Sequence, residues 1–127
     1  MDMTQISHTS LSAEWDRCKP YIISALEYAN HSHGIDDVYR AVSIGNAQFH
    51  PLENSAIVTE IVDYPKKSVC RIWLAGGDLD ELIQAEKHIS VWAKSIGCHG
   101  LEIIGRKGWE RKLTDYRCNS VVLVKEL

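Results

Sequence analysis

Residues 68–104 predict a strand, a long helix and a second strand in immediate succession, and this order constrains the fold more than any other feature. Ser68 to Leu74 (SVCRIWL) is rich in the residues that favour strands. Asp78 to Ile96 has an apolar stripe at helical spacing, formed by Leu79, Leu82, Ile83, Ile89, Ala93 and Ile96. Leu101 to Ile104 is a short buried strand. Two strands joined by one long helix favour a parallel, right-handed crossover, so we expect a βαβ unit.

Local signals mark both ends of the long helix. Ala75-Gly76-Gly77 ends the preceding strand, and Asp78 and Glu81 have capping-box spacing, with Asp in place of the usual Ser or Thr. Lys94 lies in the last turn, where a positive charge complements the helix dipole. Gly97 is the expected C-terminal cap.

The other expected strands make the sheet mixed. Ala56 to Asp63 (AIVTEIVD) is apolar on both faces, which suits an interior strand, and the turn Tyr64 to Lys67 joins it to the next strand as an antiparallel hairpin. Gln48 to Glu53 is a short strand with Pro51 on its edge. Three elements follow the βαβ unit: a turn at Gly105 to Gly108, a short helix at Trp109 to Asp115 and a final strand at Ser120 to Lys125 (SVVLVK).

Helices are expected before the first strand. Residues 11–29 form an amphipathic helix that Pro20 should kink or split in two. Ile35, Val38 and Val42 mark a second helix that ends near Gly45. We therefore expect a single domain over residues 1–127, with an N-terminal helical segment (1–34) and an α/β core (35–127). Its mixed, mainly antiparallel sheet has one parallel βαβ unit and helices on both faces.

Composition excludes several classes of protein. The formal net charge of −3 argues against a general nucleic-acid binder, and no run of apolar residues is long enough for a membrane span. The first ten residues are polar and lack the pattern of a secretory signal. The four cysteines (18, 70, 98 and 118) form no Cys-x-x-Cys pair, so we expect free thiols in a reducing compartment.

The element order of residues 35–127 resembles the GNAT acetyltransferase superfamily, with its first strand missing or displaced. The family's central strand and phosphate loop are similar to SVCRIWLAGG in this sequence. The helix that follows them is similar to DLDELIQAEKHISVWAKSIGC. The splayed strand and the short helix near the acceptor are similar to HGLEIIGRKGWERKLTDY. The sequence also resembles a group of small phage-encoded GNAT-like proteins, in which the short motifs TEI, LAGG, WA…GC and GR.GW recur. That resemblance implies a phage or prophage origin, and it places the protein in the virion or the host cytoplasm.

The resemblance implies an acetyl-CoA site at Leu74, Ala75, Gly76 and Gly77. A glycine pair before a helix lets backbone amides approach a pyrophosphate. The leading Gln or Arg of the family's loop is missing, however, and Asp78 and Asp80 stand where the phosphates would approach. The alternative is that the glycines form a turn and Asp78 caps the helix.

Glu60, inside AIVTEIV, is the candidate general base, because desolvation on a strand would raise its pKa toward the useful range. The alternative is a paired or exposed carboxylate. The resemblance also implies a general-acid Tyr in the helix before a Gly-Phe pair. If Asp115-Tyr116 stands in place of that pair, the position of the acid falls near Arg111, where this sequence has no Tyr. Tyr116 is interpreted as a packing residue.

Two further clusters contain side chains that suit a partner or a metal ion. Arg106, Lys107, Trp109, Arg111 and Lys112 form a basic, aromatic group that suits contact with a partner, or else a solvated turn with Trp109 against the core. His31, His33 and His50 lack a recognised metal-ligand spacing, so no metal site is expected.

These observations predict a GNAT-like domain without catalysis and without a bound cofactor. The resemblance to the phage-encoded group implies a structural role, in the virion, its assembly or DNA ejection, through contacts with other phage proteins or with itself. The alternative is an acyl-CoA-dependent N-acetyltransferase that uses Gly76, Gly77 and Glu60.

Overall fold

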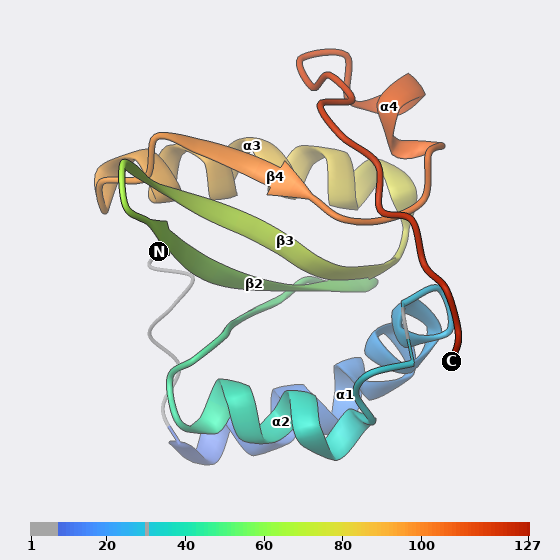
Figure 1. The fold of residues 1–127 in the computed structure, drawn as a ribbon. Coiled ribbons are helices and arrows are strands. Elements are labelled where there is room, and N and C mark those ends of the chain that lie inside the picture. Colours follow the sequence, from blue (N-terminus) through green and yellow to red (C-terminus); the bar gives the residue numbers. More distant parts are fainter. Residues whose placement is uncertain (1–7, 30) are drawn as a thin grey trace.

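The computed structural model describes residues 8–29 and 31–127 and shows a four-stranded mixed sheet (Figure 1). The strand order is β1-β2-β3-β4, with bounds Gln48–Pro51 for β1, Ser55–Tyr64 for β2, Lys67–Gly77 for β3 and Gly100–Ile103 for β4. The β1–β2 and β2–β3 pairs are antiparallel, whereas β3 and β4 are parallel. The predicted βαβ unit and mixed sheet are therefore confirmed.

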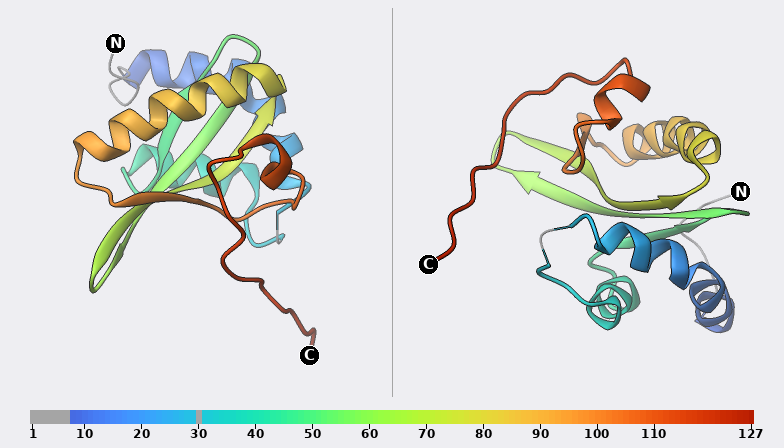
Figure 2. Two further views of the ribbon diagram at one scale, coloured as in Figure 1. Left: turned by 90° about the horizontal axis from the view of Figure 1, so that it is seen from above. Right: turned by 90° about the vertical axis from the view of Figure 1, so that its right-hand side faces the viewer.

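Helices cover both faces of the sheet, as the sequence predicts. Helix α1 (His8–Leu26) and helix α2 (Ile35–Ser43) lie on one face, and helix α3 (Leu79–Ser95) and the short helix α4 (Trp109–Lys112) lie on the other (Figure 2). No helix in the described part of the chain is long and apolar enough to cross a membrane.

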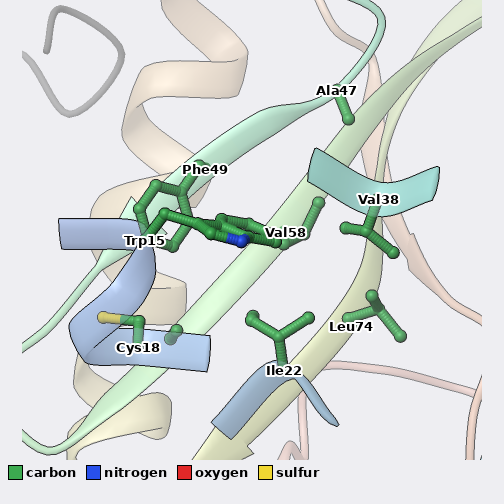
Figure 3. Packing of buried hydrophobic residues seen from close by; sticks show 9 residues of the cluster. Trp15, Cys18, Ile22, Val38, Ala47, Phe49, Val58 and Leu74 are labelled. Carbon is green, nitrogen blue, oxygen red and sulfur yellow. The ribbon is translucent and has the colours of Figure 1, made fainter. Parts of the chain in front are cut away.

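The two faces bury separate hydrophobic clusters. The cluster under α1 and α2 includes Trp15, Cys18, Ile22, Val38, Phe49, Val58 and Leu74 (Figure 3). The cluster under α3 includes Ile57, Cys70, Ile72, Leu82 and Ile89. Strand β2 contributes Val58 to the first and Ile57 to the second, which explains why its sequence is apolar on both faces.

The predicted ends of α3 are correct. The Asp78 side chain accepts a hydrogen bond from the amide of Glu81 (2.9 Å), and Gly97 adopts a φ of +95° beyond the last turn. The four cysteines are all free, and Cys18 and Cys70 are buried as small apolar side chains.

Helix α1 is a single helix through Pro20, so of the two predicted outcomes, a kink or a split, the split is wrong. Pro20 is exposed, where its ring meets solvent instead of the sheet. Trp15 and Cys18 before it and Ile22 after it are all buried in one cluster. The burial of these side chains on both sides offsets the backbone hydrogen bond that Pro20 removes.

The predicted final strand is also wrong, because residues 116–127 have no regular secondary structure. The SVVLVK segment leaves the domain as an extended tail, in which Val121 and Val122 are 74% exposed and Leu123 is 90% exposed. High strand propensity does not make a strand unless a neighbouring backbone completes the hydrogen-bond ladder. The short helix α4 likewise ends at Lys112, earlier than predicted.

One buried histidine lies between the sheet and α3. The ring of His50, on β1, is fully buried beside Trp92, with 5.5 Å between ring centroids. Its Nε2 donates to the Thr59 hydroxyl (2.8 Å), which in turn donates to Oε1 of Gln48 (2.9 Å). Among the described residues, Nδ1 of His50 has no hydrogen-bond partner. Burial therefore disfavours the charged ring and lowers the pKa of His50 to about 4.

We predict that His50→Gln flattens the dependence of stability on pH between about 6.5 and 4. In this window the unfolded chain binds a proton that buried His50 does not, so the wild-type free energy of unfolding falls on acidification, by about 3 kcal/mol in full. The neutral amide of Gln removes this loss. Urea unfolding at a series of pH values measures it, and equal slopes for the two proteins would contradict the prediction.

Candidate functional site

Strands β3 and β4 diverge, and this divergence opens the sheet. They pair over only four residues each, from Val69 opposite Gly100 to Ile72 opposite Ile103. Beyond this point β3 continues to Gly77, whereas the chain after Ile103 leaves the sheet toward α4 (Figure 1). The second half of β3 therefore has β2 on one edge and no β4 partner on the other.

A β-bulge lies where the divergence begins. Thr59 is opposite Ile72 and Val58 is opposite Leu74, so Trp73 has no partner in the β2 ladder. Trp73 and Leu74 both pack against the cluster under α1, although consecutive strand residues normally face opposite sides. A bulge bends its strand and redirects side chains, and bulges are common beside functional sites.

Hollows lie on both faces of the sheet at this opening. On the α3 side, a cavity of about 40 Å³ lies among apolar side chains that include Ile72 and Leu82. On the α1 side, the lining includes Tyr28 and Arg106. The two hollows share Ala75, Ile104, Gly105 and Trp109, and we call these four residues the splay cleft.

The lining of the cleft limits what it can hold. On the α3 side Glu86 is the one ionisable side chain of the lining, and its Oε2 accepts a hydrogen bond from the Tyr116 hydroxyl (3.2 Å). Burial, followed by the nearby charge of Glu86, raises the pKa of Tyr116. Tyr116 is half-buried here, as the sequence predicts for a packing residue. The remaining lining suits an apolar, flexible chain of atoms.

The predicted cofactor residues occupy the second half of β3. Leu74 is buried in the core under α1, and Ala75 belongs to the splay cleft. A Cβ on Gly76 would overlap the Tyr21 carbonyl oxygen of α1. Gly77 has a φ of +115°, and a Cβ there would overlap the Asn54 carbonyl. The glycine pair therefore allows α1 and the β1–β2 turn to approach β3 closely.

The N-terminus of α3 is acidic. Asp78, Asp80 and Glu81 lie at its start, and the Asp78 carboxylate already binds an amide of the first turn. The carboxylate of Glu81 accepts hydrogen bonds from the Asn54 amide (2.8 Å) and the Ser55 hydroxyl. Within the described part of the chain, no ion pair reaches these three carboxylates. Their charge opposes a phosphate group at this end of the helix.

Glu60 belongs to an ion-pair network that crosses three strands. Arg71 on β3 contacts Glu60 on β2 (3.3 Å) and Glu102 on β4 (2.7 Å). The hydroxyl of Tyr64 lies 3.4 Å from both Arg71 and Glu102. Desolvation lowers the pKa of Arg71, but its hydrogen bonds and charge interactions with Glu102 and Glu60 outweigh this and raise it. Glu60 is thus a paired, partly exposed carboxylate with 31% of its side chain accessible.

This network lies on the same face of the sheet as the Trp73 side chain. Cys70 and Ile72 point into the cluster under α3, so the alternation of β3 places Arg71 on the opposite face. Trp73 meets the ring of His33, from the α1–α2 loop, at 4.9 Å between centroids. The tip of the β2–β3 hairpin extends beyond the helices (Figure 2). The network is partly open to solvent, because the side chains of Arg71, Glu60 and Glu102 are 24%, 31% and 33% accessible. We call Glu60, Arg71, Glu102 and Trp73 the open face.

The predicted partner-binding cluster is divided between two environments. The guanidinium of Arg106 lies 3.9 Å from the centroid of the Tyr28 ring, a cation–π contact that attaches the loop after β4 to the segment following α1. Trp109 is half-buried in the splay cleft. Lys107, Arg111 and Lys112 are exposed. Partner binding by these residues stays a prediction.

His33 and His50, two of the three candidate histidine ligands, lie on opposite faces of the sheet. His50 lies on the α3 side of the sheet, whereas His33 packs on Trp73 on the α1 side. No group of three or more potential metal ligands occurs among residues 8–29 and 31–127.

Sequence reasoning missed the splay cleft, the bulge and the partners of Glu60. The available signal was the length of β3, since the apolar and small residues continue through Leu74, Ala75 and Gly76 while the following strand is short. The Arg71 contacts depend on the strand register, and no short-range pattern in the sequence shows that register.

Comparisons with known proteins agree with this architecture. No protein-family model matches the sequence, and no curated protein matches it either. This chain is similar to the solved structure of an aminoglycoside acetyltransferase from an uncultured soil metagenomic sample, in complex with sisomicin. The TM-score is 0.67 and the sequence identity is 9%, and the match covers 96% of this chain and 93% of that chain. A GNAT family acetyltransferase from Staphylococcus aureus has a TM-score of 0.59 and 10% identity over 96% of this chain and 95% of that chain. The chain thus has the GNAT acetyltransferase fold, and identities this low show the fold alone.

We predict that Gly76→Ala destabilises the domain by about 1–3 kcal/mol, because the new methyl group must displace the α1 backbone at Tyr21. Gly108→Ala is the matched control, since a Cβ there meets nothing within 4 Å and the φ of −56° suits alanine. Urea denaturation measures both. Equal stability of the two variants would contradict the packing role of Gly76.

Proposed function

We propose that this protein transfers an acyl group from an acyl-CoA thioester to an amine. The observation that carries the proposal is the splay cleft, which opens at the Trp73 bulge in a fold shared with acetyltransferases. The cleft takes the acyl-pantetheine arm. The open face, on the α1 side of the same strands, takes the amine.

The apolar lining of the splay cleft supports the proposal that the cleft binds the acyl donor. Ala75, Ile104 and Trp109 offer apolar contacts to a pantetheine chain, and the unpaired edge of β3 offers backbone groups to its amides. The cavity of about 40 Å³ holds one or two waters, so the thioester enters by widening the gap between β3 and the segment after β4. The acidic start of α3 lowers the affinity for the diphosphate, because its carboxylates repel the phosphate groups.

Charge supports the acceptor half. Glu60 and Glu102 carry two negative charges against the single positive charge of Arg71, so the open face attracts an ammonium group. Trp73 lies beside them and adds an aromatic surface on which a cation or an apolar amine substituent can rest. The acceptor is therefore a cationic primary amine.

In the reaction, Glu60 accepts a proton from the bound ammonium, and the neutral amine nitrogen attacks the thioester carbonyl carbon. The carbon–sulfur bond breaks, and the CoA thiolate leaves with the bonding electron pair. The second amine proton passes to that thiolate through solvent. Arg71 holds the Glu60 carboxylate in place through their hydrogen bond. The bulge at Trp73 is the position from which a backbone amide can be directed at the developing oxyanion.

Two observations favour a second candidate function. The acidic start of α3 and the packing role of the glycine pair account for this region without a nucleotide ligand. They favour a GNAT fold kept for its contact surfaces, as in the structural role in a phage particle that the sequence resemblance implies. Fixed-copy recovery of the chain in purified particles would support that role.

We predict that acetyl-CoA binds in calorimetric titration and that Asp80→Lys binds it at least threefold more tightly than the wild type. Asp80 is exposed in the first turn of α3, so its replacement changes the charge near the diphosphate without disturbing the core. Asp36→Lys, in the first turn of α2, is the matched control and leaves the affinity unchanged. Absence of binding by all three proteins at millimolar ligand would exclude the donor site and favour the second candidate.

We also predict that Glu60→Gln lowers kcat by about 10²–10⁴-fold while acetyl-CoA affinity stays within twofold of wild type. Gln keeps a hydrogen-bond acceptor for Arg71 but cannot accept a proton from the amine. The assay follows thiol release from acetyl-CoA in the presence of diamines and other primary amines. An unchanged kcat in Glu60→Gln would remove Glu60 from the mechanism.

A further inference from the structure

The hollow on the α3 side of the splay cleft is lined by aliphatic side chains from strands and helices. Ile57 of β2 and Ile72 of β3 contribute from the sheet. Leu82 of α3 and Leu113, which follows α4, contribute from the elements that cover this face (Figure 2). All four side chains are buried, and none of them has a polar atom. This part of the lining, which we call the aliphatic hollow, therefore favours an apolar occupant.

The hollow on the α1 side has a different chemical character. Its lining includes the Tyr28 ring and the Arg106 guanidinium, which contact each other. The two hollows share the residues of the splay cleft, among them Ala75 and Gly105. A thioester held at this point has a more polar surface on its α1 side and aliphatic side chains on its α3 side. Because the open face that receives the amine is also on the α1 side, the aliphatic hollow is left for the acyl chain.

Glu86 adds a negative charge to the lining of the aliphatic hollow. It lies one helical turn after Leu82 on α3. Its Oε2 accepts hydrogen bonds from the hydroxyls of Ser90 and Tyr116, both at 3.2 Å. Within residues 8–29 and 31–127, no cation pairs with this carboxylate. A carboxylate at the end of an acyl chain would be repelled here, so the hollow favours an uncharged chain.

The free volume limits the length of the chain. The cavity of about 40 Å³ has room for about two groups of the size of a methylene. The methyl group of an acetyl thioester stays in the gap between the strands and leaves this space empty. Two further methylenes fill the space, and the burial of each one stabilises the complex.

We infer that the preferred donor is the CoA thioester of an uncharged acyl chain of about four carbons, whose alkyl group lies in the aliphatic hollow. This inference rests on the proposed acyl transfer and names the acyl group of its donor. Ala75 and Gly105 border the passage from the gap to the hollow, and their small size leaves room for the chain to pass.

The test compares the binding of acetyl-, propionyl-, butyryl-, hexanoyl- and succinyl-CoA to the full chain by calorimetry. We expect the affinity to rise about fourfold for each methylene from acetyl to butyryl, and to rise no further with hexanoyl. Succinyl-CoA, whose acyl chain has as many carbons as butyryl, binds about tenfold more weakly than butyryl-CoA because Glu86 repels its carboxylate. Equal affinities for acetyl- and butyryl-CoA would overturn the inference and leave the proposed transfer in place. Absence of binding by all five thioesters would overturn both.

Substitutions of Leu113 change the volume of the hollow in opposite directions. Leu113→Phe fills it, so butyryl-CoA loses its advantage over acetyl-CoA, whose affinity stays within about twofold of wild type. Leu113→Ala enlarges it, so hexanoyl-CoA binds about fourfold more tightly than butyryl-CoA. Leu11→Ala is the matched control, because Leu11 packs against the cluster on the other face of the sheet and its loss leaves the order of affinities unchanged. The wild-type order of affinities in both Leu113 variants would overturn the inference.

The charge of the lining is tested with Glu86→Gln, which keeps an acceptor for the Tyr116 hydroxyl. We expect the affinity for succinyl-CoA to rise about fivefold, while the affinity for butyryl-CoA stays within about twofold of wild type. Glu110→Gln removes an exposed charge from α4 and leaves both affinities unchanged. The same response in the two variants would contradict a local role for Glu86.

Discussion

The unequal pairing of β3 is the constraint on which the rest of the structure depends. Ten of the eleven residues of β3 pair with β2 on one edge, but only four pair with β4 on the other. The first half of β3 is therefore an ordinary central strand, with its core under α3. No strand among the described residues pairs with the other edge of the second half, and the splay cleft lies at the resulting opening. The Trp73 bulge lies at the boundary between the halves.

The two ends of the opening have opposite chemical character, and this contrast defines the proposed function. Ala75 and Trp109 line an apolar cleft, whereas Asp78, Asp80 and Glu81 surround the helix N-terminus beyond it. The apolar cleft stabilises a bound acyl thioester arm, whereas the acidic helix N-terminus destabilises a bound diphosphate. The glycine pair between them is required by close packing on α1, so its presence says nothing about a nucleotide.

The sequence predicts the fold well wherever local pattern and burial agree. The α3 stripe, the Asp78 cap, Gly97 and the apolar β2 strand are all confirmed. Prediction fails where contacts between residues far apart in the sequence determine the structure. Helix α1 continues through Pro20 because its side chains are buried on both sides of the proline. Residues Ser120–Lys125 form no strand because no neighbouring strand pairs with them. Within the site, Glu60 can be singled out by its place in AIVTEIV. Its contact with Arg71 follows from strand register, which a single sequence does not specify.

In the proposed function, the gap between β3 and the segment after β4 receives an acyl thioester. Amide hydrogen exchange of the full chain, with acetyl-CoA and with the nucleotide portion alone, tests it most directly. We predict slower exchange at 73–77 and 104–109 with acetyl-CoA, and little change with adenosine 3′,5′-bisphosphate. Protection confined to other surfaces, or none at saturating acetyl-CoA, would contradict it.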